Sequence, residues 1–376
     1  MSVTLYSLSS SLHNEIEDSV LKEDFIIGIE RFLGERFVWK GDDFSSYGTC
    51  GNEVVYIRTG GTEGLFKKLG LSGKVRLLTS GRSNSLAASM EILAWLNSRG
   101  QEGEILHGNA GDIAMKIKGG DTEKAEGDGF IKPLSGIDLG GMRLGVIGKP
   151  SDWLIASGVD FAEAKKRLNV ELVDIKMDEL ISCIKSSRTD LRSFDGSVAI
   201  YEALSGIVRK HDLSGFTIRC FDLLDTVHNT GCLALARLNS EGIVSCCEGD
   251  IPAMLTMAWL QKTTGCPGFQ CNLSRIEGDN LLFAHCTVPL NMAESHTYLK
   301  HFESGIGTAV KAEMRCAPVR ICKFAPDLKS MVEIPGRIVQ NLSEPALCRT
   351  QVMVEAPGAA GYMLRSPLAN HHIISY

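Results

Sequence analysis

The residues best suited to chemistry in this sequence are carboxylates and an amide that stand directly after apolar, strand-like runs. Residues 242–246 read as a strand that leads to Glu248 and Asp250. Residues 268–271 form a second run, which ends at Asn272. In open α/β sheets, ligands bind at the carboxyl ends of strands, so this spacing predicts a binding site. A carboxylate after a wholly apolar strand needs a metal ion, a hydrogen bond or a raised pKa, which makes Glu248 the first catalytic candidate.

Asp250 and the histidines form a second group of candidates. Asp250 is followed two residues later by a proline, and this pattern is typical of a helix N-cap, a role that the sequence favours over catalysis. His285 lies inside an apolar run, where a histidine is more often a hydrogen-bonded core residue than a ligand. His371 and His372 are adjacent. Because neighbouring strand residues face opposite sides, only one of them can enter a given site.

The connection 80–85 is a candidate binding loop because it joins a strand to a helix. Its content of serine, glycine and asparagine is also that of an ordinary turn, and the sequence favours the turn. The expected substrate-binding residues are Arg82 and Asn84 of this loop, together with His301 and Arg349.

Three regions differ in the pattern of the elements that must position these residues. Residues 1–139 alternate strand-like runs with helical ones, such as 75–79 and 85–97, which predicts a parallel sheet. Residues 140–270 repeat that alternation, whereas 271–376 contain short alternating runs separated by turns. The expected fold is therefore two Rossmann-like, doubly wound α/β domains followed by a C-terminal antiparallel, β-barrel-like domain. No glycine spacing matches a dinucleotide or P-loop fingerprint.

Length and composition limit the class of protein. At 376 residues the chain is expected to form two or three domains, and 44% hydrophobic with 22% charged residues is typical of soluble globular proteins. A net charge of −6 without a stripe of Lys and Arg predicts no nucleic-acid partner. The longest uncharged apolar run, 251–260, is too short for a membrane span, and the N-terminus does not resemble a signal peptide. A cytoplasmic protein without a membrane partner is expected.

The twelve cysteines are scattered along the chain without a Cys-x-x-Cys motif. They could suggest disulfides or zinc, but this spacing favours neither. Reduced and mostly buried thiols are expected.

Four short segments recur in the same order in L-fucose isomerase and L-arabinose isomerase. They are Cys-Glu-Gly-Asp at 247–250, the run 269–272, Ala-His-Cys-Thr at 284–287 and Asn-His-His at 370–372. The chain resembles a short, divergent member of this superfamily, most clearly from about residue 216 onward. The resemblance implies two α/β domains before a β-rich one. It also implies a divalent ion, usually manganese, held by acidic residues and a histidine near the chain's end, and a homo-oligomer, expected here as a trimer or hexamer.

The resemblance assigns roles to individual residues. Glu248 matches the first acidic metal ligand, which also serves in proton transfer, and His285 matches a histidine of the arabinose isomerases. His371 matches the terminal ligand, with His372 as the alternate because the histidine is doubled. Asn272 stands where a second acidic ligand is expected. An amide brings no charge and cannot act as a base, so the resemblance implies a weaker metal site here.

The reaction that the resemblance implies is the interconversion of an aldose and a ketose, a pentose or a 6-deoxyhexose, through a cis-enediol. Such a reaction needs a Lewis acid to polarise the carbonyl and a carboxylate to move a proton between C1 and C2. Glu248, or Asp250 in place of the missing second acid, would move the proton. Two alternatives stay open: a non-catalytic sugar-binding protein, and an epimerase or lyase that shares the enediolate chemistry.

Overall fold

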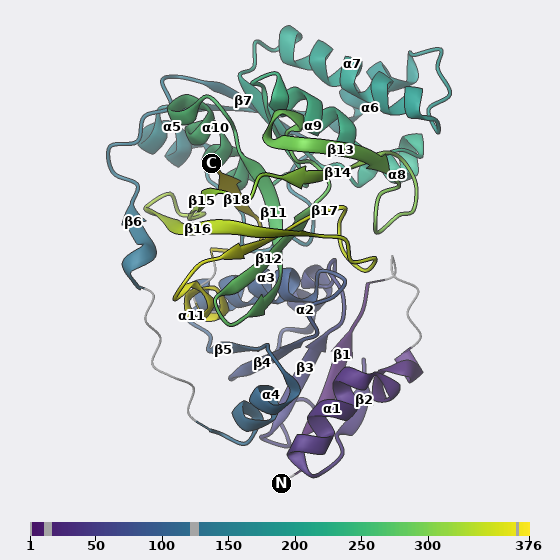
Figure 1. Cartoon of the computed structure of the whole chain (residues 1–376), viewed down its shortest axis with the longest axis vertical. Coiled ribbons are helices and arrows are strands. Elements are labelled where there is room, and N and C mark those ends of the chain that lie inside the picture. Colours follow the sequence, from purple (N-terminus) through teal and green to yellow (C-terminus); the bar gives the residue numbers. More distant parts are fainter. Residues whose placement is uncertain (1, 11–16, 121–127, 366–367) are drawn as a thin grey trace.

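The computed structural model describes residues 2–10, 17–120, 128–365 and 368–376. These residues form two parallel sheets and a large antiparallel sheet, which lies between the other two in Figure 1. The predicted combination of parallel and antiparallel sheets is confirmed. The domain boundaries at residues 139 and 270 and the Rossmann-like layout of each α/β unit stay predictions.

The first sheet is parallel, with the strand order β2-β1-β3-β4-β5. Its strands are β1 (Thr4–Leu8), β2 (Val38–Gly41), β3 (Glu53–Ile57), β4 (Val75–Thr79) and β5 (Gly103–Leu106). They alternate with α1 (Asp24–Leu33), α2 (Glu63–Leu69), α3 (Ser85–Ser98), α4 (Ala110–Ile117) and the 3-10 turns η2 (Glu17–Lys22) and η3 (Phe44–Ser46). The strand and the helix predicted at 75–79 and 85–97 are β4 and α3.

The second sheet is also parallel, with the order β10-β9-β7-β8. Its strands are β7 (Arg143–Ile147), β8 (Glu171–Ile175), β9 (Gly215–Ile218) and β10 (Val244–Cys246). Its helices are α5 (Phe161–Leu168), α6 (Met177–Lys185), α7 (Phe194–Lys210), α8 (Asp222–Val227), α9 (Cys232–Ser240) and α10 (Ile251–Thr264). Glu248 follows β10, so it stands at the carboxyl edge of this sheet, where ligands of parallel sheets bind.

The third sheet is antiparallel, with the order β15-β18-β11-β12-β17-β16-β6. Its strands are β6 (Ile131–Pro133), β11 (Phe269–Glu277), β12 (Asn280–His285), β15 (Pro318–Phe324), β16 (Ser330–Leu342), β17 (Thr350–Glu355) and β18 (His372–Ser375). A further pairing of β15 with β16 closes six of these strands into a ring. The remaining elements are the hairpin β13 (Ala293–Leu299) and β14 (Ala309–Met314), helix α11 (Ala359–Arg365), and the turns η4 (Asp128–Phe130) and η5 (Leu290–Met292).

The position of Asn272 differs from the prediction. Asn272 lies inside β11, opposite Ala284 of β12, and not at the end of a strand. The strand continues because its first residues pair with β18, which comes from the far end of the sequence. Local sequence shows a polar residue after an apolar run, but only this distant pairing shows that the strand extends past it.

Two helices are buried between layers. Helix α3 packs on β4 and β5 on one side and on β11 on the other, while α10 packs on β9 and β10 and also on β15 and β18. Both helices are apolar on nearly every side because sheets cover them on two sides. Asp250 caps the start of α10, and Gly265 ends it in a left-handed conformation with φ of 76°. Among the described residues, no helix combines the length and the apolar character that crossing a membrane requires.

His107 links the first sheet to the antiparallel sheet. Its buried ring accepts a hydrogen bond at Nε2 from the amide of Ile276 at 3.0 Å, and its Nδ1 lies 2.6 Å from Oγ1 of Thr79. Burial, helped by the charges of Lys116 and Arg275, lowers the pKa of His107 to about 4. The folded protein therefore holds this imidazole neutral.

We expect mild acid to destabilise the protein through His107. The unfolded chain binds a proton near pH 6.5, whereas the folded chain resists protonation until about pH 4. The contribution of neutral His107 to the free energy of unfolding is thus complete above pH 6.5 and is lost as the pH falls toward 4. The loss amounts to about 2 kcal/mol at about pH 5. Urea unfolding at about pH 7.5 and about pH 5 measures it. In His107→Gln the free energies of unfolding at the two pH values should differ by about 2 kcal/mol less than in the wild type. An unchanged difference would contradict the assignment.

Candidate active site

The turn after β10 holds Glu248 in a left-handed backbone conformation. Glu248 has φ of 64° and Gly249 has φ of 74°. Positive φ is uncommon for a residue with a side chain, and such strain clusters at functional sites. The turn packs tightly on the loop after β7, because a Cβ on Gly249 would lie 2.5 Å from the carbonyl oxygen of Lys149. The amide of Ser151 also donates to the carbonyl of Glu248 at 3.0 Å, so the backbone here is fixed.

The carboxylate of Glu248 is buried among donors. Nε1 of Trp153 donates to Oε2 at 2.6 Å. Nε2 of His371 lies 3.3 Å from Oε1, and Nε2 of His285 lies 3.8 Å from it. Burial alone would raise the pKa of Glu248, but the charge of His371 and the proximity of both imidazoles outweigh it and hold the pKa well below its usual range. Glu248 is therefore ionised and can serve as a base or as a ligand.

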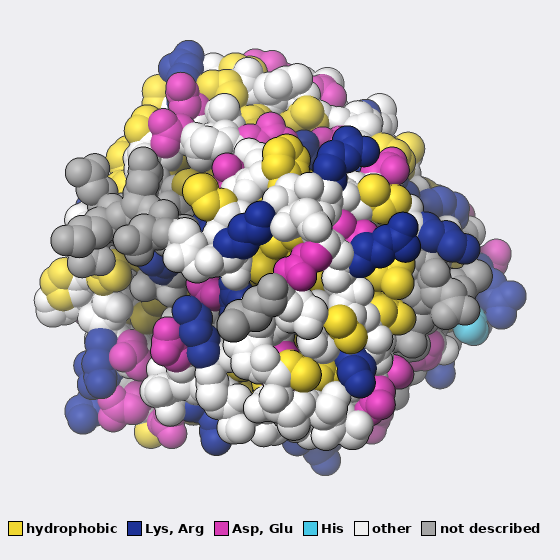
Figure 2. Space-filling view, turned by 90° about the horizontal axis from the view of Figure 1, so that it is seen from below, with side chains coloured by type: hydrophobic (Ala, Val, Ile, Leu, Met, Phe, Trp, Pro, Cys, Tyr) yellow, Lys and Arg dark blue, Asp and Glu magenta, His cyan; other side chains and the backbone are white. Residues whose placement is uncertain are grey.

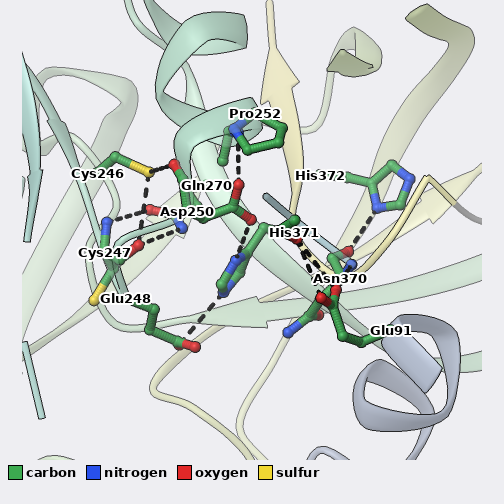
Figure 3. Close-up of polar contacts among 12 residues, drawn as sticks. Glu91, Cys246, Cys247, Glu248, Asp250, Pro252, Gln270, Asn370, His371 and His372 are labelled. Atoms are coloured by element: carbon green, nitrogen blue, oxygen red, sulfur yellow. Dashed lines mark hydrogen bonds and ion pairs between the residues drawn. The ribbon is translucent and has the colours of Figure 1, made fainter. Parts of the chain in front are cut away.

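Asp250 has no free oxygen. Its Oδ1 accepts the hydrogen bond of the Ala253 amide at 2.8 Å, which caps α10. Its Oδ2 lies 2.9 Å from Nζ of Lys323 and 2.9 Å from Nδ1 of His371, as Figure 3 shows for the histidine. Burial opposes ionisation, but the charge of Lys323 and the hydrogen bond with His371 lower the pKa of Asp250 to about 2. A carboxylate in this arrangement orients a histidine.

The two adjacent histidines differ in what they face. Nδ1 of His371 donates to Asp250, so Nε2 of this ring is directed toward Glu248 and has no hydrogen-bond partner in the protein. His372 instead donates from Nδ1 to the carbonyl of Asn370 at 3.0 Å, and its ring points away from Glu248 in Figure 3. Burial opposes protonation of His371, but Glu248 and Asp250 raise its pKa to about 9. Of the two candidates, His371 is the one that meets Glu248.

Glu91 is hydrogen-bonded to the segment that contains His371. This acid lies on α3, where Oε1 accepts from the amide of Ala156 at 2.7 Å and Oε2 accepts from the amide of Asn370 at 3.1 Å. Figure 3 shows Glu91 beside Asn370 and below His371. Burial, which outweighs these hydrogen bonds, raises the pKa of Glu91 to about 7. A single acid inside an otherwise apolar helix is a signal from which sequence reasoning could have found it.

A pocket with two lobes opens beside Glu248. The residues Asn84, Phe221, Glu248, Asn272 and Glu303 line both lobes. The first, called here the polar lobe, has a volume of about 380 Å³ and is also lined by Gly60, Gly61, Glu63, Ala87, Ala88, Trp153 and Asn370. The second, called the thiol lobe, has a volume of about 430 Å³ and is also lined by Cys220, Leu224, Thr230, Gly231, Cys232, Cys247, His285, Cys286, His301 and Cys348. Both volumes include space that is open to solvent.

Four buried polar atoms of the polar lobe have no hydrogen-bond partner in the protein. They are Oε2 of Glu63 and the Oδ1 atoms of Asn84, Asn272 and Asn370. Buried polar atoms are nearly always hydrogen-bonded, because an unpaired one costs about 1–3 kcal/mol. Four such atoms on one wall indicate a site built for a ligand with several hydroxyl groups or for an ion.

The other predicted site residues divide into two groups. Asn84 lines both lobes and His301 lines the thiol lobe, where His285 also lies. Arg82 is exposed and Arg349 donates from Nε to the carbonyl of Lys300 at 2.7 Å; neither lines either lobe. Arg82 precedes the pocket residue Asn84 by two positions and Arg349 follows Cys348, but neither side chain lines the pocket.

Four pocket residues with an acidic or aromatic side chain were not predicted from the sequence. They are Glu63, Trp153, Phe221 and Glu303. Trp153 lies in the loop after β7, a strand of the same parallel sheet as β10, so the strand-end rule points to its loop but not to the residue itself. Glu63 is the first residue of α2, and acids are so common at helix starts that no local signal separates it from others.

Several side chains in the pocket could hold a metal ion. Cys247, Glu248 and His285 can each offer a donor atom within 4.8 Å of the others. Hydrogen bonding to a neighbouring thiol and burial hold the pKa of Cys247 well above its usual range, so this thiol would have to lose its proton to bind an ion. The better donors are the carboxylate of Glu248, the imidazoles of His285 and His371, and Oδ1 of Asn272.

Comparison with known proteins points to sugar isomerases. No family model matches the chain. A curated protein described as a sulfoquinovose isomerase, from Clostridium sp. (strain MSTE9), is 26% identical over 227 residues, which cover 54% of this chain and 50% of that protein. The chain therefore spans about half the length of this relative. The chain is thus similar, distantly and over part of its length, to a sugar isomerase.

The ion pair of Asp250 yields a prediction about stability. Asp250→Asn keeps the helix cap but leaves Lys323 buried without a counter-charge, so the free energy of unfolding should fall by about 3–5 kcal/mol. Adding Lys323→Met removes the unpaired ammonium and should restore most of the loss. Urea unfolding measures both variants. Asp160→Asn, which changes the exposed N-cap of α5, is the matched control and should leave stability nearly unchanged. If Asp250→Asn were as stable as the wild type, the pair would not have this role.

Proposed function

We propose that the protein is a metal-dependent aldose–ketose isomerase that acts on an uncharged sugar, a pentose or a 6-deoxyhexose, through a cis-enediol. The observation that carries the proposal is the pairing of a carboxylate that lines the pocket with a buried imidazole behind it. The ionised carboxylate of Glu248 lies 3.3 Å from Nε2 of His371, and the polar lobe beside them contains four unpaired polar atoms. The similarity to a sugar isomerase supports the same reaction class.

The donor types beside the pocket suit a divalent ion. Asp250 accepts the hydrogen bond of Nδ1, so Nε2 is the atom of His371 that would be offered to an ion once it has released its proton. Glu248 would supply a carboxylate oxygen, Asn272 the unpaired amide oxygen, and His285 a further nitrogen. Oxygen and imidazole donors of this kind suit Mn²⁺. A bound divalent ion would act as a Lewis acid on the carbonyl of the sugar.

Glu248 is the group that we assign to proton transfer at carbon. Because Trp153 donates to Oε2, Oε1 is the oxygen that faces the imidazoles. Glu248 would take the proton from C2 of the aldose and return it to C1. Trp153 also packs edge-on against Phe221, with ring centroids 4.8 Å apart, and both rings line the polar lobe. They would cover the C–H face of the sugar and limit the access of water to the enediol.

The charge of the pocket favours a neutral substrate. The described residues that line the two lobes include Glu63, Glu248 and Glu303 but no lysine or arginine. A sulfonate or phosphate group would meet carboxylates here without a lysine or arginine side chain to pair with. For this reason we propose a neutral sugar, although the matched relative is described as an isomerase of sulfoquinovose, which is an anionic sugar.

Isomerase activity is the first test. The purified protein with Mn²⁺ should interconvert at least one neutral aldose and its ketose, and should act poorly on sulfonated or phosphorylated sugars. Glu248→Gln removes the base, so kcat should fall by at least about 100-fold. Chromatography or NMR of the sugars measures both, and a chelator should abolish turnover.

The outcomes separate the competing functions. A protein that binds a sugar equally well with and without a chelator, and converts none, would be a sugar-binding protein. Turnover by Glu248→Gln at the wild-type rate would refute the assignment of the base. A product epimeric at one carbon, or a cleaved one, would indicate another enediolate enzyme.

Metal affinity provides a second test, with a matched pair of histidines. His371→Ala should weaken Mn²⁺ binding by at least about 10-fold, because it removes a ligand, whereas His372→Ala should leave the affinity almost unchanged. Both rings are fully buried and adjacent, so any loss of packing is similar in the two variants. Isothermal titration calorimetry measures the affinities. A larger effect of His372→Ala would reverse the assignment.

A further inference from the structure

Glu63 presents a second carboxyl group to the pocket that contains Glu248. Its side chain is buried, lines the polar lobe, and has an Oε2 without a hydrogen-bond partner in the protein. The carboxyl group interacts with the backbone amide of Glu63 itself. An acid that is removed from water and given no cation is costly unless it has a function.

Close backbone packing places Glu63 beside the loop that contacts Glu248. A Cβ on the next residue, Gly64, would lie 3.3 Å from the carbonyl oxygen of Asp152, so the start of α2 is packed directly on that loop. The residue that follows Asp152 is Trp153, whose indole donates to Glu248. A Cβ on Gly60 would lie 2.9 Å from the Cβ of Asn84. The chain before α2 therefore runs along the wall of the polar lobe.

The other acids near the pocket are already engaged. Both oxygens of Glu91 accept backbone hydrogen bonds. Glu303 accepts a hydrogen bond from Nδ2 of Asn84 at 2.9 Å and is partly exposed. Glu248 contacts Trp153 and the two imidazoles. Among the described acids that line the polar lobe, Glu63 is the one with an unpaired, fully buried oxygen.

We propose that Glu63 is a second catalytic residue, the carboxyl group that moves the proton between O1 and O2 of the sugar. This inference rests on the proposed isomerase function. Asn272 stands where a second acid would be expected and cannot carry a proton in this way. Glu63, from a distant part of the chain, would supply that missing acid.

The protonation state of Glu63 agrees with this role. Burial and the negative charges of Glu91, Glu248 and Glu303 hold its pKa well above the usual range, which favours the protonated form. A protonated carboxyl group on the pocket wall can give its proton to an oxygen of the substrate.

The proton movements balance in this scheme. Glu248 takes the proton from C2, the electron pair of that C–H bond forms the C1–C2 double bond, and the carbonyl π pair moves to O1. O1 takes the proton of Glu63, which gives the cis-enediol. Glu63 then takes the proton from O2, the C2–O2 double bond forms, and C1 takes back the proton held by Glu248. Both carboxyl groups return to their starting states, and the aldose has become the ketose.

The test compares Glu63→Gln with the wild type. Glutamine has nearly the same shape and charge as a protonated glutamate but carries no transferable proton, so folding should be preserved. We expect kcat to fall by at least about 100-fold, while the affinity for Mn²⁺ and for a bound polyol inhibitor, such as the alditol of the substrate, stays within about threefold. Glu53→Gln is the matched control, because Glu53 is another buried acid in the N-terminal part of the chain, and its carboxylate accepts hydrogen bonds from the amides of Gly48 and Cys50. It should retain wild-type kcat.

Glu63→Asp keeps a carboxyl group that can carry a proton, but the shorter side chain moves this group away from the pocket by one methylene. Its kcat should lie clearly above that of Glu63→Gln, and this variant carries the test if Glu63→Gln does not fold.

Each other outcome overturns the inference. A kcat of Glu63→Gln within about threefold of the wild type would exclude proton transfer by Glu63. A loss of kcat that is matched by a loss of Mn²⁺ or alditol binding would indicate a structural or ligand role, as would equal rates for the Gln and Asp variants. If the wild type itself isomerises no sugar, the proposed function fails and this inference with it. A wild type that is active beside an unaffected Glu63→Gln overturns only the present inference.

Discussion

The buried contact of Asp250 with Lys323 and His371 is the interaction on which the rest of the site depends. It joins the cap of α10 to strand β15 and to the residue before β18, so it connects the second parallel sheet with the antiparallel one. It also fixes which nitrogen of His371 faces Glu248. An aspartate that only capped a helix would not need a buried lysine beside it. Asp250 uses one oxygen for the cap and the other for Lys323 and His371. The orientation of the site is thus determined by an interaction of the core.

The pocket is assembled where all three sheets meet. Glu63 and Asn84 come from the first sheet's connections, Glu248 from the second, and Asn272 from the antiparallel sheet. The buried helices α3 and α10 hold these layers at fixed positions, since each packs on two sheets. Glu91 adds a polar link between α3 and the segment before β18. Burial without a paired cation raises the pKa values of Glu63 and Glu91, whereas the imidazoles lower the pKa of Glu248.

Much of the fold could be predicted from the sequence because its determinants are local. Alternating apolar strands and amphipathic helices indicate parallel sheets wherever they occur, and the helix and strand at 85–97 and 75–79 are observed as α3 and β4. The pairing partners in the antiparallel sheet could not be predicted in this way. β6 joins β16 from a segment rich in glycine and charge, and β18 inserts between β11 and β15. Such pairings depend on contacts between residues far apart in the sequence.

The sequence by itself determined which chemical groups are present: an acid after β10, an amide where a second acid is expected, and a pair of histidines near its end. Only the tertiary structure decided which of them meet. It turns His371 toward Glu248 and His372 away from it, engages both oxygens of Asp250, and brings Glu63 to the same pocket. The physical reason is that residue type sets what a side chain can do. Burial, charge and hydrogen bonding, which set its protonation and direction, come from neighbours far away in the chain.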